Sequence, residues 1–501
     1  MKIAKESARH FQQKFPGSKV YHASITRREN AALFMIRQGA SQYLIIDGDA
    51  GFGFKGEKLE VSGRTYLKCL LTDENCRELR KQFPFTRPVL IGKSDSFGLG
   101  DRLGNAGPAH LKAIRKTKFR PVLAQQSIRE LERTGRTAEE VLNAASCAAF
   151  REGYTDGFGA DGDHLKTTAD IDTMVHAGYT MFTIDPGEFV RNEAAGMTVD
   201  ELLGELGSVP WREIHSEPDL FKDTWEKTEI LLSDGTRLTP ETREIYAGMV
   251  KYGAVIAHTK KMSDYIAKTY PDYPVELELS VDETDQTTTL FEHYLIASEL
   301  KRLGVELVSL APRFCGDFEK GVDFRGDLDQ FRREYIGHLS ISEKFGGYKL
   351  SIHSGSDKFS VYRQIGSVSG GSVHVKTAGT SYLEALRTLA EVRPQLFLEI
   401  LDFSMKRFET DRKSYQISGR PENITVPSPG EAGQIEALLD DDDTRQVLHV
   451  AYGSVLHGQG EISSRFKREL MEALSSHETL YEKNLESHFD KHLNPFSGDE
   501  Q

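Results

Sequence analysis

Long apolar stretches are the first thing that this chain lacks. No segment approaches the roughly 20 apolar residues of a membrane-spanning helix, and the opening MKIAKESARHFQQKF has no apolar core of a signal peptide. Cysteine is scarce: 501 residues contain four, and none forms a C-x-x-C pair, so a thiolate zinc site is not indicated. These absences predict a cytoplasmic protein with reduced thiols and no membrane partner.

Positive charge is also in deficit. The formal net charge is −13. Binding of nucleic acid needs clustered Lys and Arg to neutralise phosphates, so a large nucleic-acid-binding surface is not expected. We find no helix-turn-helix signature and no basic arm, which argues against nucleic-acid binding and against a non-catalytic sugar-acid sensor with a DNA-binding module. Hydrophobic residues make up 38 %, enough for a large core.

An alternation of apolar runs with helical patterns is what the chain does have. Such alternation is typical of βαβ units. We interpret eight runs as strands: 89–95, 120–126, 157–161, 180–185, 275–282, 305–311, 347–353 and 371–377. Helices are predicted between them, most clearly from Thr287 to Leu303 before Gly304, from Thr168 to Ala177 before Gly178, and from Ser381 onward.

Eight strand–helix steps predict an α/β fold of the (β/α)8 TIM-like barrel type. The barrel domain is expected at 87–402, with a helical insertion at about 187–274. An N-terminal α/β extension is expected at 1–86, and a mainly helical C-terminal region at 403–501. An antiparallel sheet with one wet face is the alternative, but the intervening helices argue against it.

Polar residues alternate with apolar ones along the later runs. In 275–282, Glu276, Glu278, Ser280 and Asp282 share one face. Axis-facing charges are costly to bury without partners, and the C-terminal strand ends of barrels hold the chemistry. We therefore expect the active site there, with acid–base candidates at four positions: Asp185, Glu278, Asp282 and Lys376.

Histidines recur at the same strand ends. His353 and His374 end or nearly end consecutive runs, and His164 follows the third. A single histidine is more often structural, but the shared position favours a divalent metal site. Imidazole and carboxylate ligands suit Zn, Mn, Co or Ni. The predicted ligands are His164, Glu278, His353 and His374. The other thirteen histidines, among them His10, His477 and His488, are expected to be ordinary surface residues.

Basic residues lie inside the same segments, although the protein is acidic. A cationic cluster favours an anionic small-molecule substrate. The alternative is that each cation pairs with a nearby carboxylate. The predicted substrate-binding residues are Lys93, Asp95, Arg102, Lys166, Arg313 and Lys358.

Two glycine-containing motifs are set aside as nucleotide sites. Residues 157–162 match G-x-G-x-x-G formally, but a helix rather than a strong strand is predicted before them. The segment 353–358 is not a Walker loop, although its backbone amides are able to bind an anion. A dinucleotide cofactor is therefore not expected.

Together, seven segments carry a resemblance to a known family. They are SDSFGLGDRLG (94–104), GFGADGDHLKT (157–167), FTIDPGE (182–188), ELSVDETDQTTT (278–289), LAPRFCGDFEKGVDF (310–324), KLSIHSGSDKF (349–359) and HVKTAGTSYLEALR (374–387). In these segments the chain resembles the tagaturonate epimerase family. The resemblance implies an isomerase of hexuronate catabolism that interconverts D-tagaturonate and D-fructuronate with a divalent metal. It does not specify which residues bind the metal.

The implied reaction inverts a carbon two bonds from the ketone, so simple enolisation cannot acidify its C–H bond. Retro-aldol cleavage and re-addition is the favoured route, ahead of transient oxidation by a nicotinamide or carbonyl migration through enediols. A Schiff base on Lys376 is a metal-free rival. A metal-dependent aldolase, or a ketose isomerase or epimerase acting on a related sugar, is the alternative function. A homo-oligomer is possible.

Overall fold

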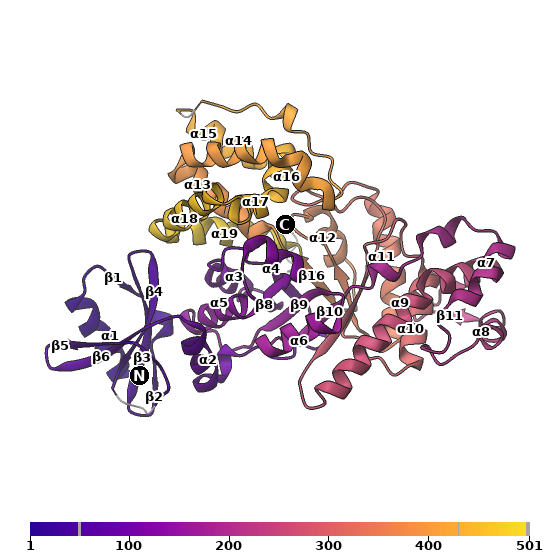
Figure 1. Ribbon diagram of the computed structural model, residues 1–501, viewed down its shortest axis with the longest axis horizontal. Coiled ribbons are helices and arrows are strands. Elements are labelled where there is room, and N and C mark those ends of the chain that lie inside the picture. The colour runs from indigo at the N-terminus through magenta and orange to yellow at the C-terminus, as the bar shows by residue number, and fades with distance from the viewer. Residues whose placement is uncertain (49–51, 429, 497–501) are drawn as a thin grey trace.

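The computed structural model describes residues 1–48, 52–428 and 430–496. Its elements form a central barrel with three attachments (Figure 1): an N-terminal sheet, a mostly helical insertion on the opposite side, and a group of C-terminal helices above the barrel. Among these residues, no helix is both long enough and apolar enough to cross a membrane.

The N-terminal part is an antiparallel sheet with a helix on its face. Its strands run in the order β1-β3-β4-β6-β5, with β2 paired to β3. Phe11 of the first helix packs against Phe34 and Tyr66 of the sheet. The elements are α1 (Lys2–Lys14), β1 (Ser18–Val20), β2 (Thr26–Arg28), β3 (Ala31–Gln38), β4 (Ser41–Asp47), β5 (Glu57–Val61), β6 (Arg64–Leu70) and α2 (Asp73–Gln82).

Eight parallel strands close the central barrel, in the order β10-β13-β14-β15-β16-β7-β8-β9. The predicted TIM-like barrel is confirmed. The strands are β7 (Ser96–Leu99), β8 (Arg120–Ser127), β9 (Gly159–Leu165), β10 (Met181–Ile184), β13 (Glu276–Val281), β14 (Ser309–Pro312), β15 (Lys349–Ile352) and β16 (Val373–Thr377). Each overlaps a predicted run except the first.

Two predicted strands need correction. The first run, 89–95, is not a barrel strand, because Val89 and Leu90 are exposed and β7 begins only at Ser96. The third run was placed too early, because β9 continues through Asp163 to Leu165. In both cases the true strand contains glycine, which normally argues against a strand. A Cβ on Gly98 of β7 would lie 1.8 Å from Gln125 Oε1, so this strand needs the glycine that normally weakens a strand.

The predicted helices form on the outside of the barrel. The helix from Thr287 becomes α10 (Leu290–Arg302), whose first turn has a Thr289–Glu292 capping box. The other two are α6 (Thr168–Ala177), which ends at the left-handed Gly178, and α13 (Thr380–Val392). The remaining helices of the barrel are α3 (Gly107–Ile114), α4 (Ile128–Thr134), α5 (Ala138–Arg151), α11 (Leu328–Lys344) and α12 (Phe359–Gly366).

The long connection between β10 and β13 is mostly helical, with one short hairpin. Its main elements are α7 (Val199–Glu205), α8 (Pro218–Trp225), β11 (Ile230–Leu231), β12 (Arg237–Leu238) and α9 (Thr242–Thr269). α9 packs along α10. In Figure 1 this segment extends away from the barrel on the side opposite the N-terminal sheet.

The C-terminal helices pack on the barrel beside α3 and α13 (Figure 1). They are α14 (Pro394–Asp411), α15 (Ala432–Ala437), α16 (Asp442–Val450), α17 (Tyr452–Leu456), α18 (Glu461–Ser476) and α19 (Glu478–Leu493). The predicted boundary between residues 402 and 403 falls inside α14, a continuous helix, so the chain has no structural break at that point. The division into three parts otherwise remains a prediction.

Candidate active site

Charged side chains meet at the C-terminal ends of the barrel strands. Parallel strands bring their carboxyl ends to one edge, so residues far apart in the chain become neighbours. The convergent side chains are Asp161, Asp163, His164, Asp185, Glu278, Asp282, His353 and Lys376. The structure thus brings together all four predicted acid–base candidates and three of the four predicted metal ligands.

Lys376 on β16 is surrounded by carboxylates. Its Nζ lies 2.8 Å from Asp161, 2.7 Å from Asp163 and 2.7 Å from Glu278. Burial lowers the pKa of this amine, but the three negative charges outweigh burial and raise it well above its ordinary value. The side chain is an ammonium ion held in place, and a protonated amine cannot attack a carbonyl to form a Schiff base.

His353, which follows β15, lies between two carboxylates. Its Nε2 is 2.8 Å from Glu278 Oε1, and its Nδ1 is 3.0 Å from Asp282 Oδ1. Burial lowers the pKa of this imidazole, but the charge of Asp282 and the hydrogen bonds to both carboxylates raise it to about 10. The surroundings of His353 therefore favour positive charge.

His164 has a matching arrangement on β9. Its Nδ1 is 3.3 Å from Asp185 Oδ2, and its Nε2 is 3.8 Å from Asp163 Oδ1. A register shift between β9 and β10, together with a left-handed φ of 53° at His164, turns this side chain toward the site. The rings of His164 and His353 lie 5.2 Å apart.

These donors fit a divalent cation. Each imidazole directs Nδ1 at a carboxylate, which is the arrangement that orients a metal-binding histidine and leaves Nε2 for the metal. The 2.8 Å between His353 Nε2 and Glu278 Oε1 matches neighbouring ligand atoms of one metal, which lie about 3 Å apart when bonds are near 2.1 Å. Asp163 supplies a further oxygen near His164 Nε2.

His374, the fourth predicted ligand, lies one layer deeper in the barrel. Its Nδ1 is 2.9 Å from the Ser96 hydroxyl, and it pairs in register with Ser96, whereas Lys376 pairs with Gly98. Burial lowers the pKa of His374 to about 3, so the ring is neutral. Its Nε2 has no hydrogen-bond partner in the described part of the chain. No contact joins it to His164 or His353 among the described residues.

The predicted substrate-binding residues are not all brought together. Lys93 donates to the Gly346 carbonyl, and Asp95 accepts from the Val373 amide at the start of β16, so both lie at the opposite end of the barrel. The side chain of Lys166 is 46 % exposed, and its Nζ lies 3.1 Å from Glu188 Oε1.

Two other predicted cations are buried. Lys358 donates to three backbone carbonyls, which supports the loop after β15, and burial lowers its pKa to about 7. Arg102 pairs with Glu130, and its guanidinium lies 3.6 Å from the centre of the Tyr452 ring. Only Arg102 and Arg313 of the six predicted residues line a cavity at the strand ends.

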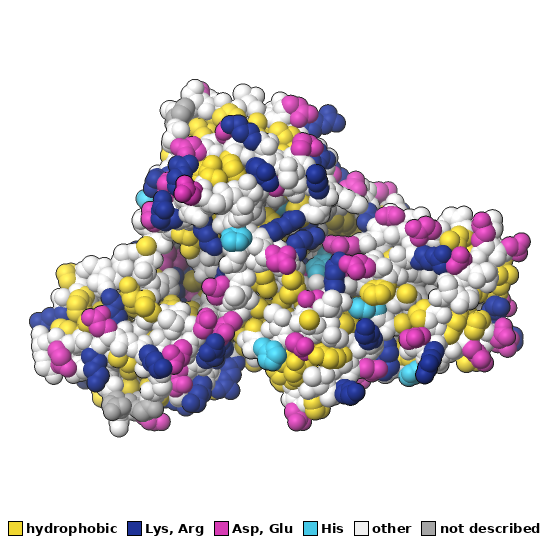
Figure 2. Space-filling model, viewed as in Figure 1, with side chains coloured by type: hydrophobic (Ala, Val, Ile, Leu, Met, Phe, Trp, Pro, Cys, Tyr) yellow, Lys and Arg dark blue, Asp and Glu magenta, His cyan; other side chains and the backbone are white. Residues whose placement is uncertain are grey.

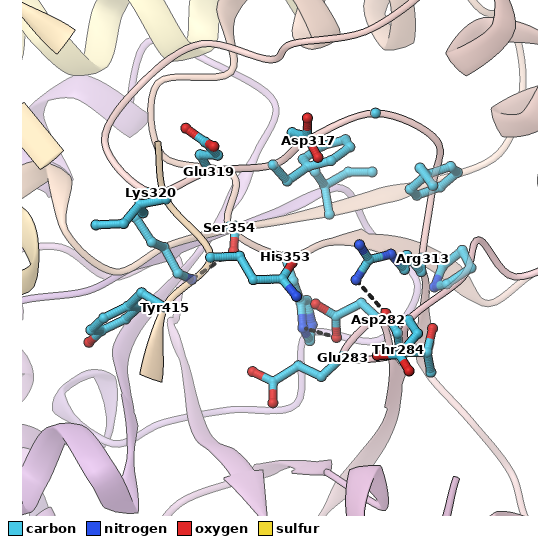
Figure 3. Close-up of a pocket in the computed structure, with 18 of the residues that line it drawn as sticks. Asp282, Glu283, Thr284, Arg313, Asp317, Glu319, Lys320, His353, Ser354 and Tyr415 are labelled. Atoms are coloured by element: carbon cyan, nitrogen blue, oxygen red, sulfur yellow. Dashed lines mark hydrogen bonds and ion pairs between the residues drawn. The ribbon is translucent and has the colours of Figure 1, made fainter. Parts of the chain in front are cut away.

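Two connected cavities open over the strand-end cluster. The outer cavity measures about 520 Å³ and is lined by Arg129, Asp282, Arg313, Lys320, His353 and Tyr415, among others. The inner cavity measures about 50 Å³ and is lined by Arg102, Gln125, Asp163, His164, Lys376 and His449, among others. Figure 3 shows His353 between Arg313 and Asp282 on one side and Lys320 and Tyr415 on the other. The cavities share lining residues, so they form one cleft that narrows toward the barrel.

Several residues of the strand-end cluster and of the cleft above it were missed by sequence reasoning. Asp161 and Asp163 belong to the polar segment GADGDH, and a correct strand assignment there would have identified them. Arg129 and Lys320 had no such signal, because each comes from a loop or helix start whose position depends on the fold. Tyr415 lies in the loop between α14 and α15, and His449 lies on α16. Both belong to the C-terminal region, which Figure 2 shows meeting the barrel where basic, acidic and histidine side chains gather.

The expectation that the remaining histidines are surface residues is wrong for seven of them. Helical context does not reveal which helix face meets the core, and these rings pack inward. His293 and His338, for example, lie 2.8 Å apart between their Nδ1 atoms. The buried ones are His110, His258, His293, His338, His449, His488 and His492.

A second histidine–carboxylate group lies between the barrel and α19. Ligand atoms of Asp357, His488 and His492 all lie within 4.8 Å of one another, so this triad is a possible metal site among the described residues. Its atoms are already engaged, however. The Asp357 amide donates to His492 Nε2, and His488 contacts Asp357 and Glu384 through its two nitrogens. A lone pair that accepts an amide hydrogen is not free to bind a metal.

Comparison with known proteins agrees with this architecture over nearly the whole chain. The model of the tagaturonate epimerase family (UxaE) matches residues 21–496. A Thermotoga maritima protein named tagaturonate/fructuronate epimerase is 38 % identical over 485 residues, covering 96 % of this chain and 98 % of that protein.

Solved structures agree as well. The native crystal structure of fructuronate-tagaturonate epimerase from Cohnella laeviribosi is 36 % identical and has a TM-score of 0.89, with 99 % of each chain covered. The same protein with two glycerol molecules has a TM-score of 0.90, with 99 % of this chain and 100 % of that chain covered. The predicted enzyme class, an isomerase of the epimerase type, is thereby confirmed, and this chain belongs to the tagaturonate epimerase family.

Proposed function

We propose that the protein interconverts D-tagaturonate and D-fructuronate. The main observation in support is the strand-end cluster of two histidines, one lysine and five carboxylates. It lies at the base of a cleft whose outer part is lined by the cations Arg129, Arg313 and Lys320. The names of the relatives support this substrate pair. The four cysteines are free thiols, which supports the predicted cytoplasmic location. A homo-oligomer stays a prediction.

Recognition of the substrate carboxylate is proposed to fall to the cations of the outer cavity. Arg313 donates to the Thr284 carbonyl, and Lys320 donates to the Ser354 hydroxyl, 2.7 Å away, so both have neutral partners. Arg129 lies with its guanidinium 5.7 Å from the centre of the Tyr415 ring. None of the three forms an ion pair with another described residue. Cations that are not neutralised by protein carboxylates favour an anionic ligand.

A divalent cation is proposed to bind at His164, Glu278 and His353, as predicted, with Asp163 as an additional ligand. When bound, it would supply Lewis-acid polarisation of the substrate ketone. The carboxylates Asp185 and Asp282 orient the two imidazoles through Nδ1. Lys376 balances the charge of the surrounding carboxylates, and its contacts leave it no free role as a nucleophile.

Asp282 is the favoured base for retro-aldol cleavage. The base must take the proton from the hydroxyl on the carbon β to the ketone and return it after the aldehyde fragment has rotated. Glu278 is fully buried and accepts from Lys376, His353 and Ser309, and both oxygens of Asp185 are engaged by Gly187 and His164. Asp282 lines both cavities and keeps 22 % of its side chain exposed, so it is accessible to substrate.

Product analysis tests the function. Incubation with D-tagaturonate, followed by NMR of the mixture, should show D-fructuronate as the net product and the same mixture from either side. Net cleavage to two three-carbon products would indicate an aldolase, and an aldose product would indicate a ketose–aldose isomerase. Either result would contradict the proposal.

Isotopes test the route. Retro-aldol chemistry changes only C–C bonding at the epimerised carbon, so its hydrogen should stay attached in D₂O, and a ¹³C isotope effect should appear at both carbons of the cleaved bond. Deuterium at that carbon after a single turnover would rule out this route in favour of carbonyl migration. Trapping of released dihydroxyacetone would support it further.

A further inference from the structure

Polar atoms without protein partners gather in the inner cavity. His449 on α16 is 1 % exposed, and neither of its ring nitrogens has a hydrogen-bond partner among the described residues. Gln125 on β8 is also 1 % exposed, and both of its amide atoms are unpartnered in the same part of the chain. Both side chains line the inner cavity beside Lys376. Buried polar groups in folded proteins are nearly always hydrogen-bonded, so these atoms are expected to pair with something that enters the cavity.

Glycines shape the space around both side chains. A Cβ on Gly379 would lie 2.0 Å from His449 Cε1, and a Cβ on Gly98 would lie 1.8 Å from Gln125 Oε1. Any other residue at either position would displace the side chain that faces it. The two polar groups are therefore packed in one position, as a binding site requires.

The C-terminal helices hold His449 in place. Asp441 caps the start of α16 through the Thr444 amide. In the first turn of the same helix, Arg445 pairs with Asp357 at 2.7 Å and donates to the Gly321 carbonyl. α16 is thereby tied to the loop after β15, which carries His353. His449 thus belongs to the same rigid assembly as the strand-end cluster.

The chemistry of the cavity suits a hydroxyl group. Burial, with Arg102 and Lys320 nearby, holds the pKa of His449 well below its ordinary value, so the ring is neutral. A neutral imidazole and a side-chain amide each offer both donor and acceptor atoms. A hydroxyl group can donate and accept, so it can pair with both kinds of atom, whereas a carboxylate can only accept. Arg102 adds an unpartnered Nη1, but Glu130, 3.0 Å away, offsets its charge.

We infer that His449 and Gln125 bind the terminal hydroxymethyl group of the ketouronate, so that the C-terminal helices complete the active site. This assignment rests on the proposed function. It places the neutral three-carbon end of the substrate in the inner cavity and the carboxylate end toward Arg313 and Lys320. The bond cleaved in the retro-aldol step then lies between them, beside His353 and Asp282.

A substrate analogue with a methyl group in place of the hydroxymethyl group tests the assignment. The wild-type enzyme should show kcat/KM lower by about 10–100-fold for this analogue, the usual range for loss of one or two hydrogen bonds in a buried site. His449→Phe should lower kcat/KM for the full substrate by a similar factor and then show little further loss with the analogue. His449→Gln, which keeps a donor and an acceptor, should recover part of the difference.

Two further variants keep the test decisive. Gln125→Leu tests the same site from the barrel side if His449→Phe fails to fold. His338→Phe replaces a neutral buried histidine outside the cleft and should leave the ratio between the two substrates at its wild-type value.

The possible outcomes separate the two proposals. An unchanged substrate ratio in His449→Phe and Gln125→Leu would overturn the inference, since the two side chains would then pair only with water. Loss of discrimination against a neutral carboxamide analogue instead would also overturn it, because His449 would then face the carboxylate end. If the wild-type protein does not epimerise the ketouronate, the proposed function fails, and calorimetric binding of the same analogue pair still tests His449.

Discussion

Two histidine–carboxylate clusters in this protein have similar composition and different character. At the strand ends, His164 and His353 face carboxylates and line a cleft. Between the barrel and α19, Asp357, His488 and His492 are packed together. Asp357 belongs to the loop after β15, which also carries His353. The charges of its partners raise the pKa of His353 to about 10, whereas burial lowers that of His492 to about 3 despite the nearby Asp357.

The difference teaches that ligand spacing alone does not make a site. The triad satisfies the distance criterion for a metal, yet His492 Nε2 already accepts a hydrogen from the Asp357 amide, which cannot bind a cation. In the strand-end cluster, His353 Nε2 faces Glu278, a carboxylate that can itself be a metal ligand. The strand-end group is less compact, but it combines surplus negative charge, oriented imidazoles and access from a cavity of about 520 Å³. We therefore assign chemistry to the first cluster and structural support to the second.

Metal removal is the strongest way to break this comparison. Exhaustive chelation should abolish turnover, and Mn²⁺, Co²⁺, Ni²⁺ or Zn²⁺ should restore it, because the strand-end donors suit such cations. Elemental analysis before and after chelation supplies the control. Full activity in a metal-free preparation would remove the metal from the proposal.

Single substitutions then locate the metal. His353→Ala should lose bound metal and at least about 100-fold in kcat/KM, because removing a direct ligand costs more than the ~10–100-fold typical of outer groups. His374→Ala tests the remaining predicted ligand and should cost less, since the hydrogen bonds of its Nδ1 are to Ser96 rather than to the cluster. Metal stoichiometry and kcat/KM are measured together, and wild-type stoichiometry in His353→Ala would exclude that residue.

Arg313→Ala is expected to act on substrate binding. KM for the ketouronate should rise by roughly 10–100-fold, the effect of losing a charge-assisted hydrogen bond to the carboxylate. KM for the matching neutral ketohexose should change little. Equal changes for both sugars would show that Arg313 does not face the carboxylate.

The triad should respond in the opposite way. His492→Ala leaves the buried Asp357 amide without its partner and opens a cavity, so the free energy of unfolding should fall by about 2–4 kcal/mol. Metal content should stay at the wild-type value in the folded fraction. Loss of metal without loss of thermal stability would reverse our assignment of the two clusters.

Much of the fold was predictable because strand–helix alternation is a local signal. Seven of the eight barrel strands overlap predicted runs, and the helix that ends at Gly178 was placed correctly from its glycine. β7 was missed because SFGL is short and contains a glycine. Gly98 is needed there because a Cβ at this position would clash with the side chain of Gln125. A glycine that serves a neighbour from another strand resembles a strand breaker when only the sequence is read.

The candidate site was predictable only in part, for a similar reason. His164, Glu278 and His353 stand at strand ends, so their convergence follows from parallel strands closing into a barrel. Lys93 and Asp95 were grouped with them because the first strand was placed too early, which reversed the end of the barrel to which they belong. Register errors of a few residues therefore move a side chain from one end of the barrel to the other.

The sequence by itself determined the barrel class, the family resemblance and the strand-end residues, because each depends on order along the chain. Only the tertiary structure decided which charges are neutralised and which remain available. Lys376 is held by three carboxylates from β9 and β13, and His449 reaches the cleft from α16, a helix of the C-terminal region far along the chain from β16. Burial and pairing are properties of neighbours in space, and the fold alone brings those neighbours together.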